Sequence, residues 1–421
     1  MSSTPPFKDP LSSMQTQDAS PFFRLPLELR RSVYTHAFDF SACHLHSSPA
    51  SDGTPTLRIT ACVAPTASAE DNLDGSERCP VKGTPGHRKW PVPSQIFKRR
   101  AQSSWGPHWM CEELALYPKD CGEDVLEERS VALSRHFTRA LKVCRRMFWD
   151  LIGEAMVMAE FHIAGLRTLK ALLEVEEPSA DDFDVDYFIR SRIRNLSITL
   201  RAPLAFFNDI EKSRYTSQQV QGHSSSSSLK DEGDVAFWSR VPSILLPRAP
   251  HLRRLQLWLD HDGEEYWSVV NEREILGPME TLATSNPSLN LVCILPKAHP
   301  AIEDRQRHFL PEDEEHHGQS SSGFEIRRIL RQRYRVLMSD VLGREYMEYV
   351  IDFPHTHPRS SLFPTTPRDE LEQHEAAGWR RGINVIRAAA VSRGFRYSKR
   401  SRWLASPREV EAGEFLPLFK K

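Results

Sequence analysis

The sequence has no long run of apolar residues. Stretches such as residues 291–295 fall far short of the roughly 18 to 20 apolar residues that a membrane-spanning helix needs. The first twenty residues also contain no apolar segment of the kind that forms the centre of a signal peptide. We therefore expect an intracellular protein, in the cytoplasm or the nucleus, with no membrane partner.

Cysteine is scarce, and an excess of charge of either sign is missing. The chain of 421 residues has 7 cysteines, an odd number, and no Cys-x-x-Cys pair. This usage favours reduced thiols over a disulfide framework.

The 55 Lys and Arg residues nearly balance the 56 Asp and Glu residues. Such a balance excludes a chain-wide field that would attract nucleic acid, so a charged partner must be recognised by one segment.

The common signatures of catalysis are absent as well. The sequence contains no G-x-G-x-x-G, no G-x-x-x-x-G-K-[ST], no H-E-x-x-H and no G-x-S-x-G. These motifs would indicate phosphate binding, zinc proteolysis or a serine nucleophile. We therefore predict that the protein is not an enzyme and that it needs no cofactor.

Two residue pairs approach the spacing of zinc ligands. Cys43-x-x-His46 and His108-x-x-Cys111 could together supply two nitrogens and two sulfurs for a closed tetrahedral site. The first pair lies at the edge of a segment that we expect to be flexible, and pairs of this kind also arise by chance. The sequence therefore leads us to predict no metal site.

Proline, serine, threonine and glycine divide the chain into short apolar islands. The 30 prolines gather with these residues in stretches that bury too little apolar surface to offset the entropy of ordering. The expected organisation is a disordered leader (1–20), one body (21–40 and 94–298) with flexible insertions (41–93 and 213–233), a linker (299–323), a helical segment (324–353), a second linker (354–369) and a basic helical segment (370–421).

Apolar spacing predicts the elements of the body. Apolar residues recur every three or four positions over 133–155, which indicates a long amphipathic helix. Strands are expected near 161–163, 193–198, 252–257 and 289–295, and helices over 166–173 and 271–285. Two of these strands fit L-x-x-L-x-L, which is typical of leucine-rich-repeat strands, although 59 residues separate them. Strand, helix and strand in succession favour a parallel crossover and a small irregular sheet.

Two short segments resemble the halves of an F-box. Residues 25–34 read Leu-Pro-Leu-Glu-Leu-Arg-Arg-Ser-Val-Tyr, which resembles the opening L-P-x-E-L-x-x-x-I and has proline where a helix can begin. Residues 141–149 read Leu-Lys-Val-Cys-Arg-Arg-Met-Phe-Trp and resemble the closing L-x-x-V-C-R-x-W. With Glu154-Ala155 and Phe161-His162-Ile163 downstream, the arrangement is similar to fungal F-box-like proteins of uncharacterised function.

This resemblance implies both a fold and a function. The fold would be α+β or α/β, with an F-box-like helical unit at the N-terminus packed on a small irregular leucine-rich-repeat-like sheet. The function would be non-enzymatic protein interaction, as a substrate adaptor of a ubiquitin ligase that joins an unknown client to a Skp1-type adaptor. The residues at or beneath the contact surface would be Leu25, Pro26, Leu29, Val33 and Tyr34. The alternative is that these residues only dock their helix on the one that contains Cys144.

The C-terminal segment supports a second function. Residues 379–403 contain eight Arg or Lys residues, no acidic residue, and two interleaved aromatic rings. Cations neutralise phosphates and aromatic rings stack on unpaired bases, so this composition suits nucleic acid. The candidate contact residues are Arg393, Arg396, Lys399, Arg400 and Arg402. A nuclear-import signal, or a helix over 379–391 docked on the body, explains the same residues and is the favoured interpretation.

Overall fold

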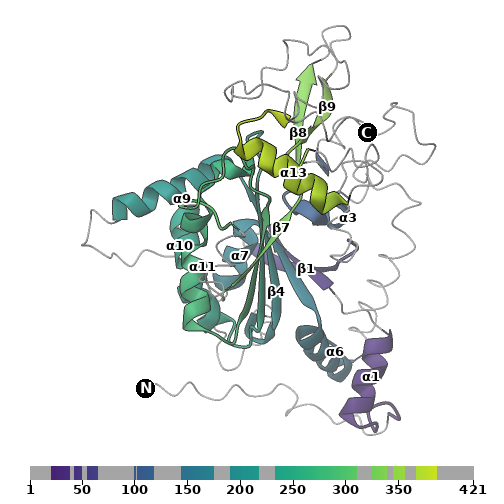
Figure 1. Ribbon diagram of the computed structural model, residues 1–421. Helices are drawn as coiled ribbons and strands as arrows, with labels where there is room; N and C mark the ends of the chain where they lie inside the picture. Colours follow the sequence, from purple (N-terminus) through teal and green to yellow (C-terminus); the bar gives the residue numbers. More distant parts are fainter. Residues whose placement is uncertain are drawn as a thin grey trace, which may run out of the picture.

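Figure 1 shows the computed structural model of the chain, which describes residues 20–37, 42–49, 55–64, 99–100, 102–117, 144–174, 190–217, 233–310, 324–338, 345–355 and 367–385. Within them, the α-helices are α1 (Leu27–Ala37), α3 (Trp109–Leu116), α6 (Arg145–Met158), α7 (Gly165–Glu174), α9 (Leu204–Ser217), α10 (Asp234–Arg248), α11 (Glu272–Ser285) and α13 (Arg368–Arg380). Two short 3-10 helices are η3 (Gly106–His108) and η6 (Trp267–Val269). None of the described helices is long and apolar enough to cross a membrane.

The strands form one large sheet and a separate hairpin. They are β1 (Ala42–Pro49), β2 (Pro55–Ala61), β3 (Glu160–Ala164), β4 (Asn195–Ala202), β5 (Arg254–His261), β6 (Asn290–Pro296), β7 (Glu325–Ile329), β8 (Gln332–Met338) and β9 (Glu345–Ile351). The seven-stranded sheet has the order β2-β1-β3-β4-β5-β6-β7, and β8 pairs with β9. β1 and β2 are antiparallel, and all other neighbours in the large sheet are parallel. The predicted α/β class is confirmed.

The parallel strands run in sequence order, with helices between them. α11 lies between β5 and β6 in the chain, and these strands pair in parallel, which confirms the predicted crossover. The two L-x-x-L-x-L segments became the neighbouring strands β4 and β5, with Leu196 beside Leu255 and Ile198 beside Leu257. Their leucines therefore point to one shared face, as the alternation of side chains along a strand requires.

That face holds the main apolar core, which helices cover. Leu196, Leu255 and Leu291 belong to this core, together with Trp238 of α10 and Met279 of α11. In Figure 1, α9, α10 and α11 stand on one side of the sheet. Each of these helices buries one apolar stripe. The apolar side of the helices therefore packs on the apolar side of the strands in this core.

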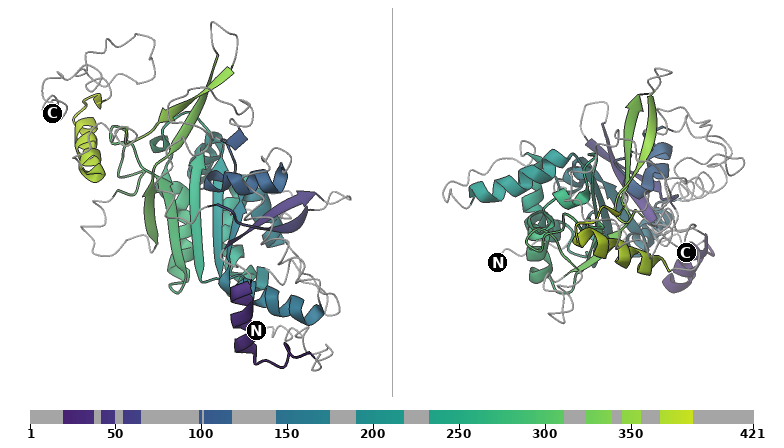
Figure 2. Two further views of the ribbon diagram at one scale, coloured as in Figure 1. Left: turned by 90° about the vertical axis from the view of Figure 1, so that its right-hand side faces the viewer. Right: turned by 45° about the horizontal axis from the view of Figure 1, so that its top comes forward.

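η3 and α3 cover part of the opposite face of the sheet. Figure 2 (left) shows α3 lying across this face, on the side away from α9 to α11. Gly106 of η3 comes so close that an added Cβ atom would lie 2.8 Å from the ring of Trp258 in β5. Its φ of +54° also favours glycine. Because Ser197 and Thr199 of β4 are buried here too, this face is more polar than the helix-covered face.

The prediction that residues 41–93 form a flexible insertion is wrong for two parts of this range. β1 and β2 belong to the large sheet, and β1 pairs with β3 through Cys43 beside Phe161 and Leu45 beside Ile163. The sequence signal was weak because β1 alternates apolar residues with His44 and His46, which are buried on the polar face. The neighbouring strand β3 supplies the hydrogen bonds that its composition does not suggest.

The prediction of a helical segment over 324–353 is also wrong, because this range contains β7, β8 and β9. The mixed spacing of Ile326, Ile329 and Leu337 resembles a helical stripe. The first two residues instead belong to β7, which pairs in parallel with β6. Residues 332–338 then pair with β9 as an antiparallel hairpin. Tertiary pairing therefore overrides a weak local pattern.

The C-terminal helix lies earlier than predicted. α13 ends at Arg380, close to where a helix over 379–391 was expected to begin. Gly382 has a φ of +77°, which turns the chain so that Ile383 and Val385 pack with Trp379 in a small core. The turn ends the helix because glycine adopts this conformation without strain.

Other predictions are confirmed or corrected within the described residues. β3, α7 and α11 lie where strands and helices were expected, and the described part of the long 133–155 helix is α6. Residues 299–310 of the predicted linker pack on the body, where Arg307 pairs with Glu211 at 2.7 Å. α9 extends to Ser217, inside the predicted 213–233 insertion. The 1–20 leader, apart from its last residue, lies outside the described residues.

A buried ion-pair network lies at the end of the polar face, where β5 ends. Arg331 Nε lies 2.6 Å from Asp260 Oδ1, and Arg331 Nη1 lies 3.5 Å from Asp352 Oδ2. Arg201 Nε of β4 lies 3.6 Å from Asp260 Oδ2. Burial would raise the pKa of Asp260, but the guanidinium groups of Arg331 and Arg201 hold it below its usual value. The network therefore joins the large sheet to the segment before β8.

Replacing Arg331 by methionine should destabilise the protein strongly. The variant leaves Asp260 buried with a weaker counter-charge, so the free energy of unfolding should fall by about 3–5 kcal/mol at pH 7. Urea denaturation measures this loss. Because the pKa of Asp260 is lowered in the folded state, its contribution is present at neutral pH and disappears as the pH falls below about 4. The difference in the free energy of unfolding between R331M and the unaltered protein should therefore shrink as the pH falls.

The matched control is Arg327→Met. Arg327 is half-exposed and pairs with the exposed Glu325 on the same strand. Such a pair contributes about 1 kcal/mol or less, so this variant should unfold almost like the unaltered protein. Equal losses in R327M and R331M would show that the buried network does not stabilise the fold.

Candidate functional site

The two halves of the F-box-like pattern meet in space. α1 packs against α6, and Figure 2 (left) shows the pair at the end of the molecule far from the β8–β9 hairpin. Arg30 of α1 forms an ion pair with Asp150 of α6, which also accepts a hydrogen bond from the Tyr34 hydroxyl at 3.3 Å. Arg31 Nε lies 2.6 Å from Glu154 Oε1. We call this unit, α1 with α6 and the turn at 20–25, the helical head.

Two aromatic residues close the helical head on its N-terminal side. Phe22 contacts Phe23 edge to face, with ring centroids 5.3 Å apart, and it contacts Tyr34 at 5.5 Å. The guanidinium of Arg30 lies 5.7 Å from the centre of the Phe23 ring, and that of Arg146 lies 5.1 Å from it. Cations over an aromatic face are attracted by its quadrupole, so these rings join both helices.

One face of α1 packs on α6, and another is exposed. Tyr34 is completely buried, and burial together with the Asp150 carboxylate raises the pKa of its hydroxyl. In contrast, the exposed fractions of Leu27, Leu29 and Val33 are 39%, 53% and 44%. Leu29 and Val33 are four residues apart and so lie on the same side of the helix. The helical head therefore presents apolar side chains to solvent.

The residues predicted to bind a partner divide into two groups. Leu29, Val33 and Pro26 are exposed and Leu25 is partly buried, whereas Tyr34 lies beneath the surface against α6. The nucleic-acid candidates Arg393, Arg396, Lys399, Arg400 and Arg402 lie outside the described residues, and that function stays a prediction. Two cations of the 379–403 segment are described: Arg380 pairs with Glu303 at 2.5 Å, and Arg381 Nε donates to the Ala377 carbonyl at 3.2 Å.

A second cluster of chemically active side chains lies under α3. His44 of β1, Cys62 after β2, and His108 and Cys111 around the start of α3 place one ligand atom each within 4.8 Å of one another. Cys62 Sγ lies 3.8 Å from Cys111 Sγ and 3.4 Å from His108 Nδ1. We call these four residues the Cys-His cluster. A donor set of two thiols and two imidazoles is one that binds a metal ion.

The sequence identified half of this cluster and misassigned the other half. His108 and Cys111 come together as their spacing suggested. Cys43 instead packs against the main core, because it precedes His44 in a strand and points to the opposite face. His46 lies on the same face as His44, where its ring contacts that of Trp105 at 5.7 Å, but it is not a member of the cluster.

Burial and neighbouring groups set the protonation of the cluster. Burial and the nearby His108 lower the pKa of His44 well below its usual value, and they lower that of His162, on the adjacent strand β3, to about 3. These imidazoles are therefore neutral. The contact with Cys62 lowers the pKa of Cys111, and the Val63 N–H, which donates to Cys111 Sγ at 3.3 Å, acts in the same direction.

Comparison with known protein families matches residues 15–305 to a domain of unknown function, DUF7730. The chain belongs to this family. No curated protein and no solved structure matches the chain. The DUF7730 domain spans the helical head, the Cys-His cluster and the sheet through β6, so both candidate sites lie within the family's own unit.

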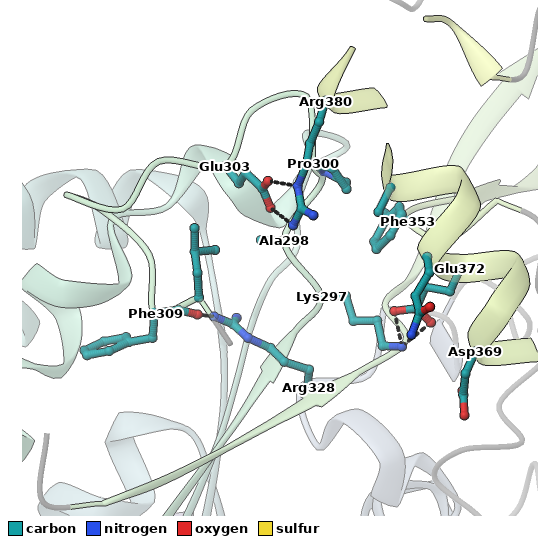
Figure 3. A pocket seen from close by; sticks show the side chains of 13 residues that line it. Lys297, Ala298, Pro300, Glu303, Phe309, Arg328, Phe353, Asp369, Glu372 and Arg380 are labelled. Atoms are coloured by element: carbon teal, nitrogen blue, oxygen red, sulfur yellow. Dashed lines mark hydrogen bonds and ion pairs between the residues drawn. The ribbon is translucent and has the colours of Figure 1, made fainter. Parts of the chain in front are cut away.

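A pocket lies where the DUF7730 domain meets the segment that follows it. Figure 3 shows this pocket, which has a volume of about 650 Å³ and lies between the loop after β6, Arg328 of β7 and α13. Two ion pairs stand in its wall: Lys297 Nζ with Glu372 Oε2 and Arg380 Nε with Glu303 Oε1, each at 2.5 Å. These pairs neutralise four of the charged side chains in the wall, so the pocket is a weaker candidate than the helical head.

The helical head should depend on the ion pair between its helices. In Asp150→Ala, Arg30 keeps its buried position but loses its counter-charge, and Tyr34 loses its acceptor, which should cost about 3 kcal/mol or more. Because the loss is local, peptides from α1 should exchange their amide hydrogens faster while those from β5 do not change. Hydrogen–deuterium exchange mass spectrometry measures both.

Asp209→Ala is the control for this prediction. Asp209 is exposed and pairs with the exposed Lys212 three residues away, so its loss should leave exchange in α1 unchanged. If D150A leaves α1 as protected as D209A does, the ion pair does not hold the helical head together.

Proposed function

We propose that this DUF7730 protein is a non-enzymatic interaction module that binds a Skp1-type adaptor through α1, as an F-box-like substrate adaptor of a ubiquitin ligase. The observation that carries the proposal is the exposure of Leu29 and Val33 on a helix whose other face is buried. The F-box-like resemblance puts these same residues at the contact surface. A large apolar side chain exposed beside another on one helix face is a feature of binding surfaces.

The way α1 is held supports this function. Arg30 and Tyr34 bind Asp150 on one side, so the helix is already formed and oriented before a partner arrives. A partner therefore has to order few residues, and this lowers the cost of association. Leu29 and Val33, four residues apart, have the spacing with which an amphipathic helix enters a hydrophobic groove.

The body would then present the client. Its parallel strands follow one another in sequence order, and α10 and α11 pack side by side over one face. This regular order is what supports a leucine-rich-repeat-like description of the sheet. In the proposed module, the helical head binds the adaptor and another surface of the chain binds a client protein of unknown identity.

The adaptor interaction should depend on the exposed residues of α1. The double variant Leu29→Asp with Val33→Asp places charges where apolar contact is required, so affinity for a Skp1-type adaptor should fall at least about tenfold, or 1.4 kcal/mol. Isothermal titration calorimetry with purified full chain and adaptor measures this change. Thermal unfolding should be almost unaffected because both side chains are exposed.

Ile302→Asp is the matched control. Ile302 is similarly exposed, at 42%, but lies in the loop after β6, so its variant should bind the adaptor like the unaltered chain. Absence of adaptor binding by the full chain would contradict the proposal, and so would equal affinity in the α1 double variant and in I302D. In either case the helical head has a purely structural role.

A further inference from the structure

We propose that His44, Cys62, His108 and Cys111 bind one zinc ion in a closed, structural site within the DUF7730 domain. The proposal departs from the expectation of no metal, which rested on sequence spacing alone. Only two of the four residues lie close together in the sequence, and the fold supplies the other two from β1 and from the end of β2.

The distances match tetrahedral zinc coordination. Zn–S bonds of about 2.3 Å at a tetrahedral angle place two sulfurs about 3.8 Å apart, and a Zn–N bond of about 2.1 Å places nitrogen about 3.6 Å from each sulfur. In the cluster, Cys62 Sγ and Cys111 Sγ are 3.8 Å apart, and His108 Nδ1 is 3.4 Å from Cys62 Sγ. These two distances fit tetrahedral zinc, and all four ligand atoms lie within 4.8 Å of one another.

The surroundings also point to a metal ion. His44 is buried, and its Nε2 has no hydrogen-bond partner among the described residues. A buried polar atom without a partner costs free energy, which a metal bond at this ring would offset. The Val63 N–H donates to Cys111 Sγ at 3.3 Å, as backbone amides do around thiolate ligands that need stabilisation.

The donor set selects zinc over the other common ions. Two sulfurs and two imidazole nitrogens in a tetrahedral arrangement suit Zn²⁺, whereas Mg²⁺ and Ca²⁺ require oxygen ligands. Four protein ligands fill the coordination sphere, so no position is left for a water or a substrate, and the site is structural. Around it, Trp105 stacks on His44 with ring centroids 4.8 Å apart, and His162 also stacks on His44, at 5.1 Å.

The zinc ion would cross-link segments that lie far apart in the sequence. His44 lies in β1 and Cys62 just after β2, while His108 and Cys111 lie 46 and 49 residues beyond Cys62. A bond from each segment to one ion cross-links the edge of the sheet to η3 and α3. Such a cross-link reduces the entropy of the unfolded chain more when the closed loop is long.

The test is the metal content of the purified full chain. After expression in medium with added zinc, inductively coupled plasma mass spectrometry should find about one zinc ion per chain. Exchange with cobalt(II) should give thiolate-to-cobalt charge-transfer bands and the visible bands of tetrahedral cobalt. Cys62→Ser, Cys111→Ser and His44→Gln should each lower the bound zinc at least about tenfold, because each removes a ligand.

Two neighbours provide matched controls. Cys43→Ser removes a thiol beside His44 that points to the opposite face, and His46→Gln removes an imidazole from the same face outside the cluster. Both variants should keep their zinc, and in both a chelator should lower the melting temperature as it does in the unaltered protein.

Several outcomes would overturn the site. One is an unaltered chain without zinc or cobalt bands, and another is a disulfide between Cys62 and Cys111 in place of metal. A third is a different metal, and a fourth is an equal loss of zinc in C43S and C62S. If the ligand variants fail to fold, the zinc content and the cobalt spectrum of the unaltered protein still decide.

Discussion

The parallel strands at the centre of this protein must bury both of their faces, and the rest of the structure follows from the different ways in which they do so. One face is apolar and is covered by α7, α10 and α11, which requires only helices with an apolar stripe. The other face carries histidines, hydroxyls and an aspartate beside a small apolar cluster of Trp258, Val292 and Ile294. Buried polar groups need specific partners, so this face determines which segments must return to the sheet.

The partners on the polar face come from distant parts of the chain. Asp260 at the end of β5 is neutralised by Arg331, from the segment after β7, and by Arg201 of β4. The histidines of β1 and β3 are covered instead by Trp105 and His108 from the segment around η3. On this face, ionic and ring contacts hold the returning segments in place. On the other face, the apolar core holds the helices.

The apolar face could be predicted from the sequence, whereas on the polar face only the pairing of His108 with Cys111 could be. L-x-x-L-x-L predicted β4 and β5, and the helix expected over 271–285 is α11, because burial on one face produces a regular period. β1 was missed because His44 and His46 replace apolar residues in its alternation, and Cys62 was missed because its partners depend on that strand. The sequence alone does not reveal that a polar residue is buried, because its burial depends on a partner from elsewhere in the chain.

The topology explains why the two halves of the helical head meet although about a hundred residues separate them. α1 leads into β1 after a short connection, and α6 leads into β3 almost at once. β1 and β3 are parallel neighbours, with Ala42 beside Glu160, so their preceding helices enter the sheet at the same end and side by side. The described elements between β1 and α6 are β2, which forms the edge of the sheet, and η3 and α3. The intervening chain can be long without separating α1 from α6, because strand pairing fixes the distance between them and Arg30 with Asp150 completes the contact.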